Sequence, residues 1–199
     1  MARLMALLAL VLMTARALAA ASPAVEALET LRRSFRDTAG FTADVVQEKR
    51  LSLMKKRLVS RGVVRFRTPD TFFMELYPPH ASRLLLKDNL LLMHLPGQAT
   101  QRVVLPPGEG LGKWFAFLSR PVNAVPEGAE VTATRQGGLW QLQLAPKGEG
   151  GVRRIAIVFD GEGRIFRVAI DERNGDRTEL AFRNFRRNVP LTERDFRVE

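Results

Sequence analysis

Two hydrophobic periods follow each other along the chain. Between Pro23 and Gly40, apolar residues recur every three or four positions behind a serine, which predicts one amphipathic helix that ends at Gly40. From Phe41 onward, apolar and polar residues alternate, and this period of two is typical of strands with one buried face. The expected strands lie at residues 41–45, 62–66, 72–76, 84–86, 90–95, 103–105, 131–135, 139–145, 155–159, 165–170 and 177–185.

Short turns separate most of the expected strands. Asp88-Asn89, Gly137-Gly138, Asp160-Gly161 and Asn174-Gly175 are pairs that favour tight hairpins. Strands joined so closely are antiparallel, because parallel pairs need long crossovers. We therefore expect a mainly β (α+β) fold with about eleven antiparallel strands. The leucine runs at 84–86 and 90–92 further indicate strands that are covered on both faces.

Helical spacing returns once in the middle of the chain. The apolar residues there follow Gly108 and Gly110 and precede Pro121, which predicts a short second helix. These residues are Leu111, Trp114, Phe115 and Leu118.

The N-terminal segment predicts export. It has a basic start, an apolar run at residues 4–13 and small residues at 17–21 that suit a signal peptidase. The apolar run is shorter than the roughly 18 residues of a membrane helix. We expect a signal peptide at residues 1–21, cleaved after Ala19 or Ala21, and a single soluble domain at residues 22–199.

The size of the expected sheet bears on function. A sheet of that many strands must curl, and two short helices cover only part of its concave side. The rest is filled either by side chains that meet across a closed barrel or by an apolar hollow. With 12 Phe against 1 Tyr and 2 Trp, the aromatic surface carries few polar groups, as a hydrocarbon site requires. Phe is equally common in ordinary β cores, which is the more frequent reason for it.

The charge is strongly basic. The formal charge of +10 falls only to +8 when Arg3 and Arg16 leave with the signal. For an exported protein this charge fits anionic lipid headgroups or acidic protein surfaces, and we expect no nucleic-acid partner. The interpretation that we favour is a compositional bias, because 25 scattered Arg residues stand against 6 Lys.

Signatures of catalysis and metal binding are missing from the sequence. Without cysteine there are no disulfides, thiolate ligands or acylated N-terminal Cys. His80 is expected in a turn and His94 in the core, and no G-x-S-x-G pattern occurs. Residues 160–163 fit a hairpin turn better than a calcium loop, and residues 108–112 lack the G-K-[ST] of a P-loop. We expect no enzyme activity, metal or cofactor.

The order of motifs resembles a known family. The first strand reads Phe41-x-Ala43-x-Val45-x-Gln47-x-Lys49, and Gly62-Val63-Val64-Arg65-Phe66 and Pro69-x-x-Phe72 follow. The chain is similar in these motifs to the LolA/LolB superfamily of outer-membrane lipoprotein carriers, which have F-x-A-x-F-x-Q-x-K and G-x-[LV]-x-[FW]-x-x-P-x-x-F segments. A turn like Lys87-Asp88-Asn89 and a strand that ends near a proline like Pro96 complete the resemblance.

The resemblance implies an incomplete barrel with helices as a lid over a hydrophobic cavity for acyl chains. Its motif position assigns Phe72 to the cavity, and alternation adds Met74 and Leu76. The expected lining is Val45, Val64, Phe66, Phe72, Met74, Leu76, Leu84 and Leu86. The expected lid residues are Leu28, Leu31, Phe35, Trp114, Phe115 and Leu118.

The same resemblance implies a function in the periplasm. The protein would be a monomer that receives a lipoprotein or acylated lipid client from an inner-membrane ABC transporter and passes it to an outer-membrane acceptor. Two departures from the family pattern, Thr68 in place of an arginine before the motif proline and the end of the chain at Glu199, indicate a paralogue. The alternative is a periplasmic lipid-sensing or protein-interaction module on the same fold.

Overall fold

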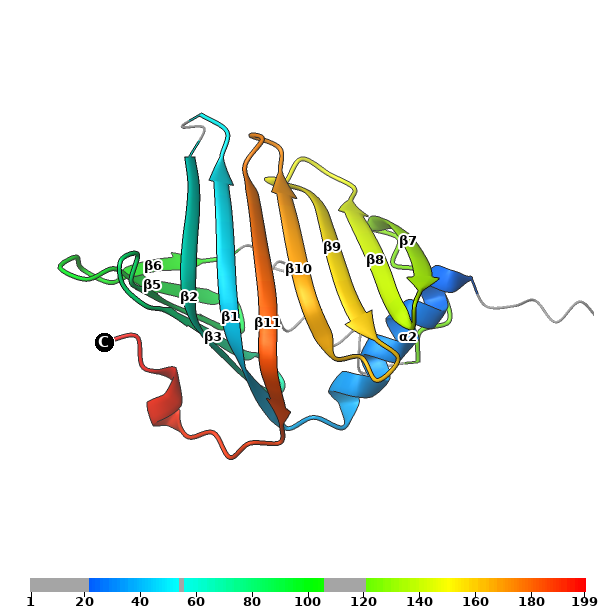
Figure 1. The fold of residues 1–199 in the computed structure, drawn as a ribbon, viewed down its shortest axis with the longest axis horizontal. Helices are drawn as coiled ribbons and strands as arrows, with labels where there is room; N and C mark the ends of the chain where they lie inside the picture. Colours follow the sequence, from blue (N-terminus) through cyan, green and yellow to red (C-terminus); the bar gives the residue numbers. More distant parts are fainter. Residues whose placement is uncertain (1–21, 54–55, 106–120) are drawn as a thin grey trace, which may run out of the picture.

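The fold is an open antiparallel sheet of eleven strands with one α-helix against it, within the described residues 22–53, 56–105 and 121–199 of a computed structural model (Figure 1). The strand order is β6-β5-β4-β3-β2-β1-β11-β10-β9-β8-β7, so β6 and β7 are the two edges of an incomplete barrel. The expected signal peptide and second helix lie outside the described residues. The elements are α2 (Pro23–Arg36), β1 (Gly40–Leu51), β2 (Lys56–Arg67), β3 (Thr71–Leu76), β4 (Ser82–Lys87), β5 (Leu90–His94), β6 (Gln101–Val104), β7 (Ala129–Gln136), β8 (Leu139–Pro146), β9 (Val152–Asp160), β10 (Ile165–Glu172), β11 (Arg177–Arg187) and the 3-10 helix η1 (Glu193–Phe196).

The ends of α2 follow from local chemistry. The Ser22 hydroxyl accepts a hydrogen bond from the Val25 N–H at 3.3 Å, and Pro23 stands in the first turn. The helix ends at Arg36 rather than at Gly40, so the expected end was four residues too late. Gly40 instead begins β1, where a Cβ atom would lie 2.6 Å from the Phe66 carbonyl oxygen.

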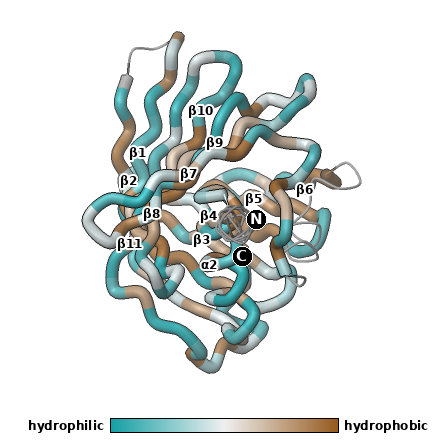
Figure 2. Tube along the Cα trace, turned by 90° about the vertical axis from the view of Figure 1, so that its right-hand side faces the viewer, coloured by the Kyte–Doolittle hydropathy of each residue, from teal (hydrophilic) through white to brown (hydrophobic). Residues whose placement is uncertain are grey.

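The predicted strands are confirmed, and many extend by a few residues beyond their apolar stretch. The central strand β1 pairs with both β2 and β11 over most of its length. Figure 1 shows β3, β5 and β6 crossing behind the long strands, and Figure 2 shows that the sheet is strongly curved. The curl expected from the strand number is therefore present, and it gives the sheet a concave inner face.

Two packed clusters form the core on this inner face. The first joins α2 to β7, β8 and β9, and its buried members are Ala27, Leu28, Leu31, Val122, Trp140, Leu142, Leu144 and Phe159. The second lies on β1, β2 and β3, and its buried members are Phe41, Ala43, Val45, Val64, Phe66 and Leu76.

The C-terminal segment packs on the outer face. The ring of Phe196 lies 6.4 Å from that of Phe73, and the Arg67 guanidinium stacks 4.8 Å from the Phe196 ring. Arg67 also forms an ion pair with Glu193 at 2.7 Å. Arg67 thus points away from the inner face, as alternation predicts, and it holds η1 in place.

Two expectations about β4 and β5 need correction. Their leucines are half-buried rather than covered on both faces, because these strands lie toward the β6 edge, beyond α2 and η1. His94 is also half-buried in β5 rather than in the core, and its Nδ1 lies 3.1 Å from the Thr100 hydroxyl. His80 lies in the exposed turn before β4, as predicted.

Candidate functional site

Two rows of apolar side chains cross the inner face from β1 toward β6. Directly paired residues of antiparallel strands point to the same side of a sheet, so the register defines each row. One row consists of Phe41, Phe66, Phe72, Leu86, Leu91 and Val103. The other consists of Ala43, Val64, Met74, Leu84 and Met93.

Burial decreases along both rows. Phe66 is 3% exposed and Val64 is fully buried, whereas Phe72 and Met74, their partners on β3, are only half-buried. The leucines of β4 and β5 are half-buried too, and Val103 at the edge is 47% exposed. The inner face of β3, β4 and β5 is thus an apolar surface that the described residues cover only in part.

The structure divides the predicted cavity residues into two groups. Phe72, Met74, Leu84 and Leu86 keep exposed surface on the inner face. Val45, Val64 and Phe66 are buried in the second cluster, because Phe41, Leu180 and Phe182 also pack there. These three residues pack in the core beside the partly exposed surface and have almost no exposed area for a ligand. Leu76 is 7% exposed and joins the cluster to the cleft described below.

The structure also separates the predicted lid residues. Leu28 and Leu31 pack with Trp140 and Phe159, in a different cluster from Phe72. Phe35, near the end of α2, reaches the second cluster, where its ring lies 6.2 Å from that of Phe41 and 6.1 Å from that of Phe66. Trp114, Phe115 and Leu118 lie outside the described residues. Of the expected lid, Phe35 is therefore the described residue nearest to the partly exposed rows.

A cleft of about 380 Å³ continues the inner face beyond Leu76. Its volume falls in the range of small-molecule sites. Its apolar lining is Leu58, Leu76, Ala81 and Leu95, and its polar lining is Gln47, Lys49, Ser60, His80 and Ser82. The sequence alone does not reveal the cleft, although Gln47 and Lys49 continue the alternation that begins at Phe41.

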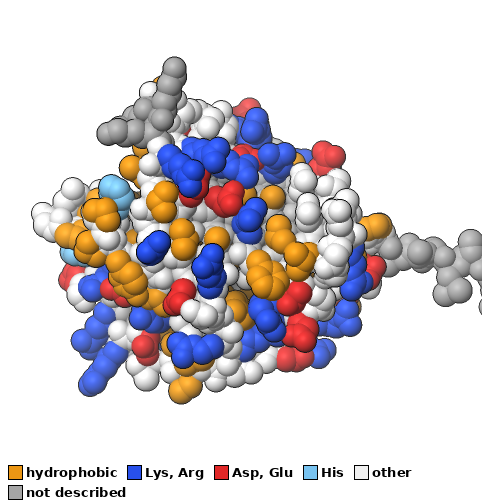
Figure 3. All heavy atoms as spheres, in the orientation of Figure 1, with side chains coloured by type: hydrophobic (Ala, Val, Ile, Leu, Met, Phe, Trp, Pro, Cys, Tyr) orange, Lys and Arg blue, Asp and Glu red, His pale blue; other side chains and the backbone are white. Residues whose placement is uncertain are grey.

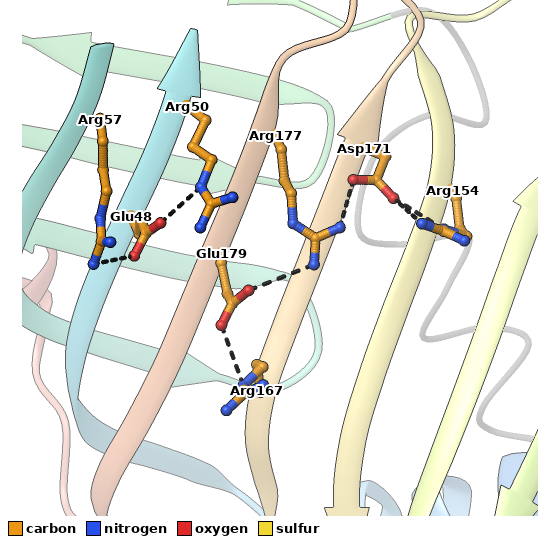
Figure 4. A network of polar contacts seen from close by, with 8 residues as sticks. All are labelled: Glu48, Arg50, Arg57, Arg154, Arg167, Asp171, Arg177 and Glu179. Carbon is orange, nitrogen blue, oxygen red and sulfur yellow. Dashed lines mark hydrogen bonds and ion pairs between the residues drawn. The ribbon is translucent and has the colours of Figure 1, made fainter. Parts of the chain in front are cut away.

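The outer face has the opposite character, with charged side chains over its central strands (Figure 3). Figure 4 shows two groups of ion pairs there. Glu48 binds Arg50 and Arg57 at 2.9 and 2.7 Å, and Asp171 binds Arg154 and Arg177 at 2.6 and 2.7 Å. Burial raises the pKa of Asp171, but the two guanidinium groups outweigh it and the net pKa is lowered. On this part of the sheet, charged side chains therefore stand among the apolar ones.

The Glu29 carboxylate of α2 binds the backbone at Val122, close to where the described residues resume at 121. Glu29 accepts hydrogen bonds from the Val122 N–H at 3.0 Å and from Arg32 at 2.6 Å. The Arg32 hydrogen bond, opposed by burial and helped by the Val122 N–H, lowers the pKa of Glu29 to about 2. Val122 in turn is buried in the first cluster against Leu28 and Trp140.

Two kinds of feature are missing from the described residues. Within the described ranges, no three His, Cys, Asp or Glu side chains gather as a metal site would require. None of the described helices is long and apolar enough to cross a membrane.

Comparison with known proteins fits this architecture. The family model described as "Outer membrane lipoprotein carrier protein LolA" matches residues 36–199, which is most of the chain. The protein belongs to the LolA family. The match begins at the end of α2 and includes every strand, so both rows of the inner face and the cleft lie within the LolA region.

Solved structures that resemble this chain are distant in sequence. A LolA superfamily protein from Nitrosomonas europaea has a TM-score of 0.48 and 12% identity, over 89% of this chain and 98% of that one. A DUF1329 family protein from Desulfovibrio piger has a TM-score of 0.49 and 9% identity, over 88% and 98%. MucB in the Pseudomonas aeruginosa MucA/MucB complex has a TM-score of 0.47 and 12% identity, over 88% and 61%. No curated protein sequence matches the chain.

Proposed function

We propose that this LolA family protein binds the acyl chains of a lipoprotein or another lipid-modified client on the inner face of β3, β4 and β5. The client would travel with its chains against Phe72, Met74, Leu84 and Leu86, shielded from water, toward the outer membrane. This assignment takes residues 22–199 as one carrier domain, exported to the periplasm after removal of residues 1–21.

One observation carries the proposal. The inner rows change from fully buried on β2 to half-buried on β3 without any change from apolar to polar residues. A monomeric protein gains nothing from partly exposed Phe, Met and Leu side chains in contiguous rows, and such surfaces are typical of binding sites. Each methylene group of a ligand buried there contributes roughly 0.8 kcal/mol, so part of an acyl chain is enough for strong binding.

The proposed activity is carriage without a chemical step. The ligand's hydrocarbon would be held by apolar contact without a covalent bond, which lets it leave toward an acceptor that offers a larger apolar surface. An inner-membrane ABC transporter as donor, an outer-membrane acceptor and a monomeric carrier complete the proposal. The name of the family, a lipoprotein carrier, supports this role.

The proposal is tested by titration of a fluorescent fatty acid into the purified mature protein. Phe72→Glu places a charge on the partly exposed row and should weaken binding at least tenfold, because a buried carboxylate loses its hydration. The matched control is Val59→Glu, since Val59 lies on the outer face of β2 and is 45% exposed. This variant should bind like the wild type.

Absence of binding by the wild type, or equal binding by the two variants, would overturn the proposal. Native mass spectrometry of freshly purified protein adds a second readout, since a retained lipid identifies the ligand class. A protein partner recovered together with a carrier that binds no fatty acid would favour an interaction module instead.

A further inference from the structure

The inner face changes character along β1. Phe41, Ala43 and Val45 are buried and apolar, whereas Gln47 and Lys49, the next residues on the same side, are half-buried and polar. The register carries the change to β2, where Val45 pairs with Gly62 and Gln47 with Ser60. The cleft beyond Leu76 lies at this polar end.

Ser60 is the least exposed of the polar residues that line this cleft. It is 6% exposed, and its hydroxyl makes no hydrogen bond with any described residue. The hydroxyl oxygen keeps access to solvent, because no fully enclosed side-chain oxygen or nitrogen among the described residues lacks a partner, so it can exchange hydrogen bonds with a ligand in the cleft.

Lys49 supplies the charge of the cleft. Its side chain is half-buried, and it forms no ion pair within the described part of the chain. The charge of Lys49 acts on Asp176, but the Asp176 carboxylate already accepts hydrogen bonds from the Ser52 N–H at 2.9 Å and the Ser52 hydroxyl at 3.1 Å. The Ser52 N–H is the largest cause of the lowered pKa of Asp176, and Lys49 adds only a smaller, through-space contribution. The Lys49 ammonium group therefore remains available to a ligand.

An amphiphile matches this arrangement at both ends. Leu58, Leu76, Ala81 and Leu95 give the cleft an apolar wall, and Leu76 connects it with the second cluster, to which Met74 and Phe72 are packed. Lys49, Ser60, Gln47 and Ser82 provide donors for oxygen atoms on the other side. A lysine ammonium is a compact positive charge suited to a phosphate or carboxylate group.

From this placement we infer that the cleft binds the anionic end of the acylated ligand, with Lys49 as the charged contact and Ser60 as the hydrogen-bonding contact. The inference rests on the proposed function, because it orients the same ligand: hydrocarbon along β3, β4 and β5, and a phosphate or carboxylate group between β1, β2 and the turn before β4.

Isothermal titration calorimetry with three probes tests the inference. The probes are dodecyl phosphate, dodecanol and inorganic phosphate, each below any micelle concentration. The wild type should bind dodecyl phosphate about tenfold more tightly than dodecanol, the order expected for a charge-assisted hydrogen bond at a partly exposed site. Inorganic phosphate alone should give no measurable binding.

Three variants locate the effect. Lys49→Gln should abolish the preference for dodecyl phosphate and leave dodecanol binding unchanged, which also shows that the variant is folded. Ser60→Ala should reduce the preference by about threefold, as for loss of one neutral hydrogen bond. Lys87→Gln removes the same charge at an exposed position at the end of β4 and should behave like the wild type.

The outcomes separate the two proposals. A tenfold preference that persists in Lys49→Gln, or equal wild-type binding of dodecanol and dodecyl phosphate, overturns the cleft assignment while acyl binding stands. Tight binding of inorganic phosphate that Lys49→Gln abolishes overturns an amphiphile site in favour of a free-anion site. Failure of both dodecanol and dodecyl phosphate to bind contradicts the proposed function itself.

Discussion

Val64 of β2 and Met74 of β3 are directly paired on the inner face, yet Val64 is fully buried and Met74 is not. The edge of the packed core therefore falls between two neighbouring strands, a step of about 4.8 Å. On one side of this edge the inner face stabilises the fold. On the other side the same kind of residues remains available to a ligand.

Gly62 is expected to be essential for the pairing of β2 with β3. A Cβ atom at this position would lie 1.9 Å from the Glu75 carbonyl oxygen and 2.9 Å from the Leu76 Cα, so the backbones would have to separate. Gly62→Ala should lower the free energy of unfolding by about 3 kcal/mol. Urea denaturation measures the loss. Gly128→Ala is the control, since nothing lies within 4 Å of its Cβ position, and a comparable loss there would contradict the steric explanation.

Phe196 should contribute to stability although it lies three residues from the end of the chain. It is 4% exposed and packs against the 2%-exposed Phe73. Phe196→Ala should cost about 3 kcal/mol, the order found when a buried Phe is truncated. Thermal or urea unfolding measures this cost. Phe166→Ala, at a position that is 38% exposed, should cost less than about 1 kcal/mol. Equal losses would mean that η1 does not dock on the outer face.

Glu29 should make stability depend on acid pH. Its folded pKa of about 2 lies below the ordinary value of 4.5, chiefly because of the Arg32 hydrogen bond. A lowered carboxylate pKa stabilises the folded state fully above the unfolded pKa, and the contribution is lost as the pH falls through the folded pKa.

The comparison of wild type with Glu29→Gln isolates this effect. At pH 6 the variant should be less stable by about 1 kcal/mol, the order of one charge-assisted hydrogen bond at a partly exposed site. The difference should shrink between pH 4.5 and pH 2, where the wild-type carboxylate becomes protonated. Urea unfolding at several pH values measures it, and a difference that stays constant down to pH 2 would refute the assignment.

The strands and the inner face follow from local alternation. Residues such as Val45, Val64 and Phe66 are correctly assigned to the same face because a period of two needs no long-range information. Alternation also continues to Gln47 and Lys49, which share the inner face, but polar residues at the end of a strand look like a solvated edge. Their role in a cleft becomes apparent only when β2 and the turn before β4 are placed beside them.

Other features depend on contacts between distant residues. The sequence favours Phe72 over Phe73 for the inner face, yet Phe73 is the more buried of the two because Phe196 covers it from the outer side. Likewise, the helical period of Leu28 and Leu31 predicts an apolar face without saying what it meets. That face meets Trp140 and Phe159, which follow more than 100 residues later.

The central claim is that hydrocarbon lies on the inner face of β3, β4 and β5. The most direct measurement is photo-crosslinking with a fatty acid that carries a diazirine near its terminal carbon, followed by mass spectrometry of the labelled peptides. We expect labels on Phe72, Met74, Leu84 or Leu86, and competition by unlabelled fatty acid. Labels confined to outer-face residues such as Val59, or labelling that leaves residues 71–94 untouched, would contradict the account.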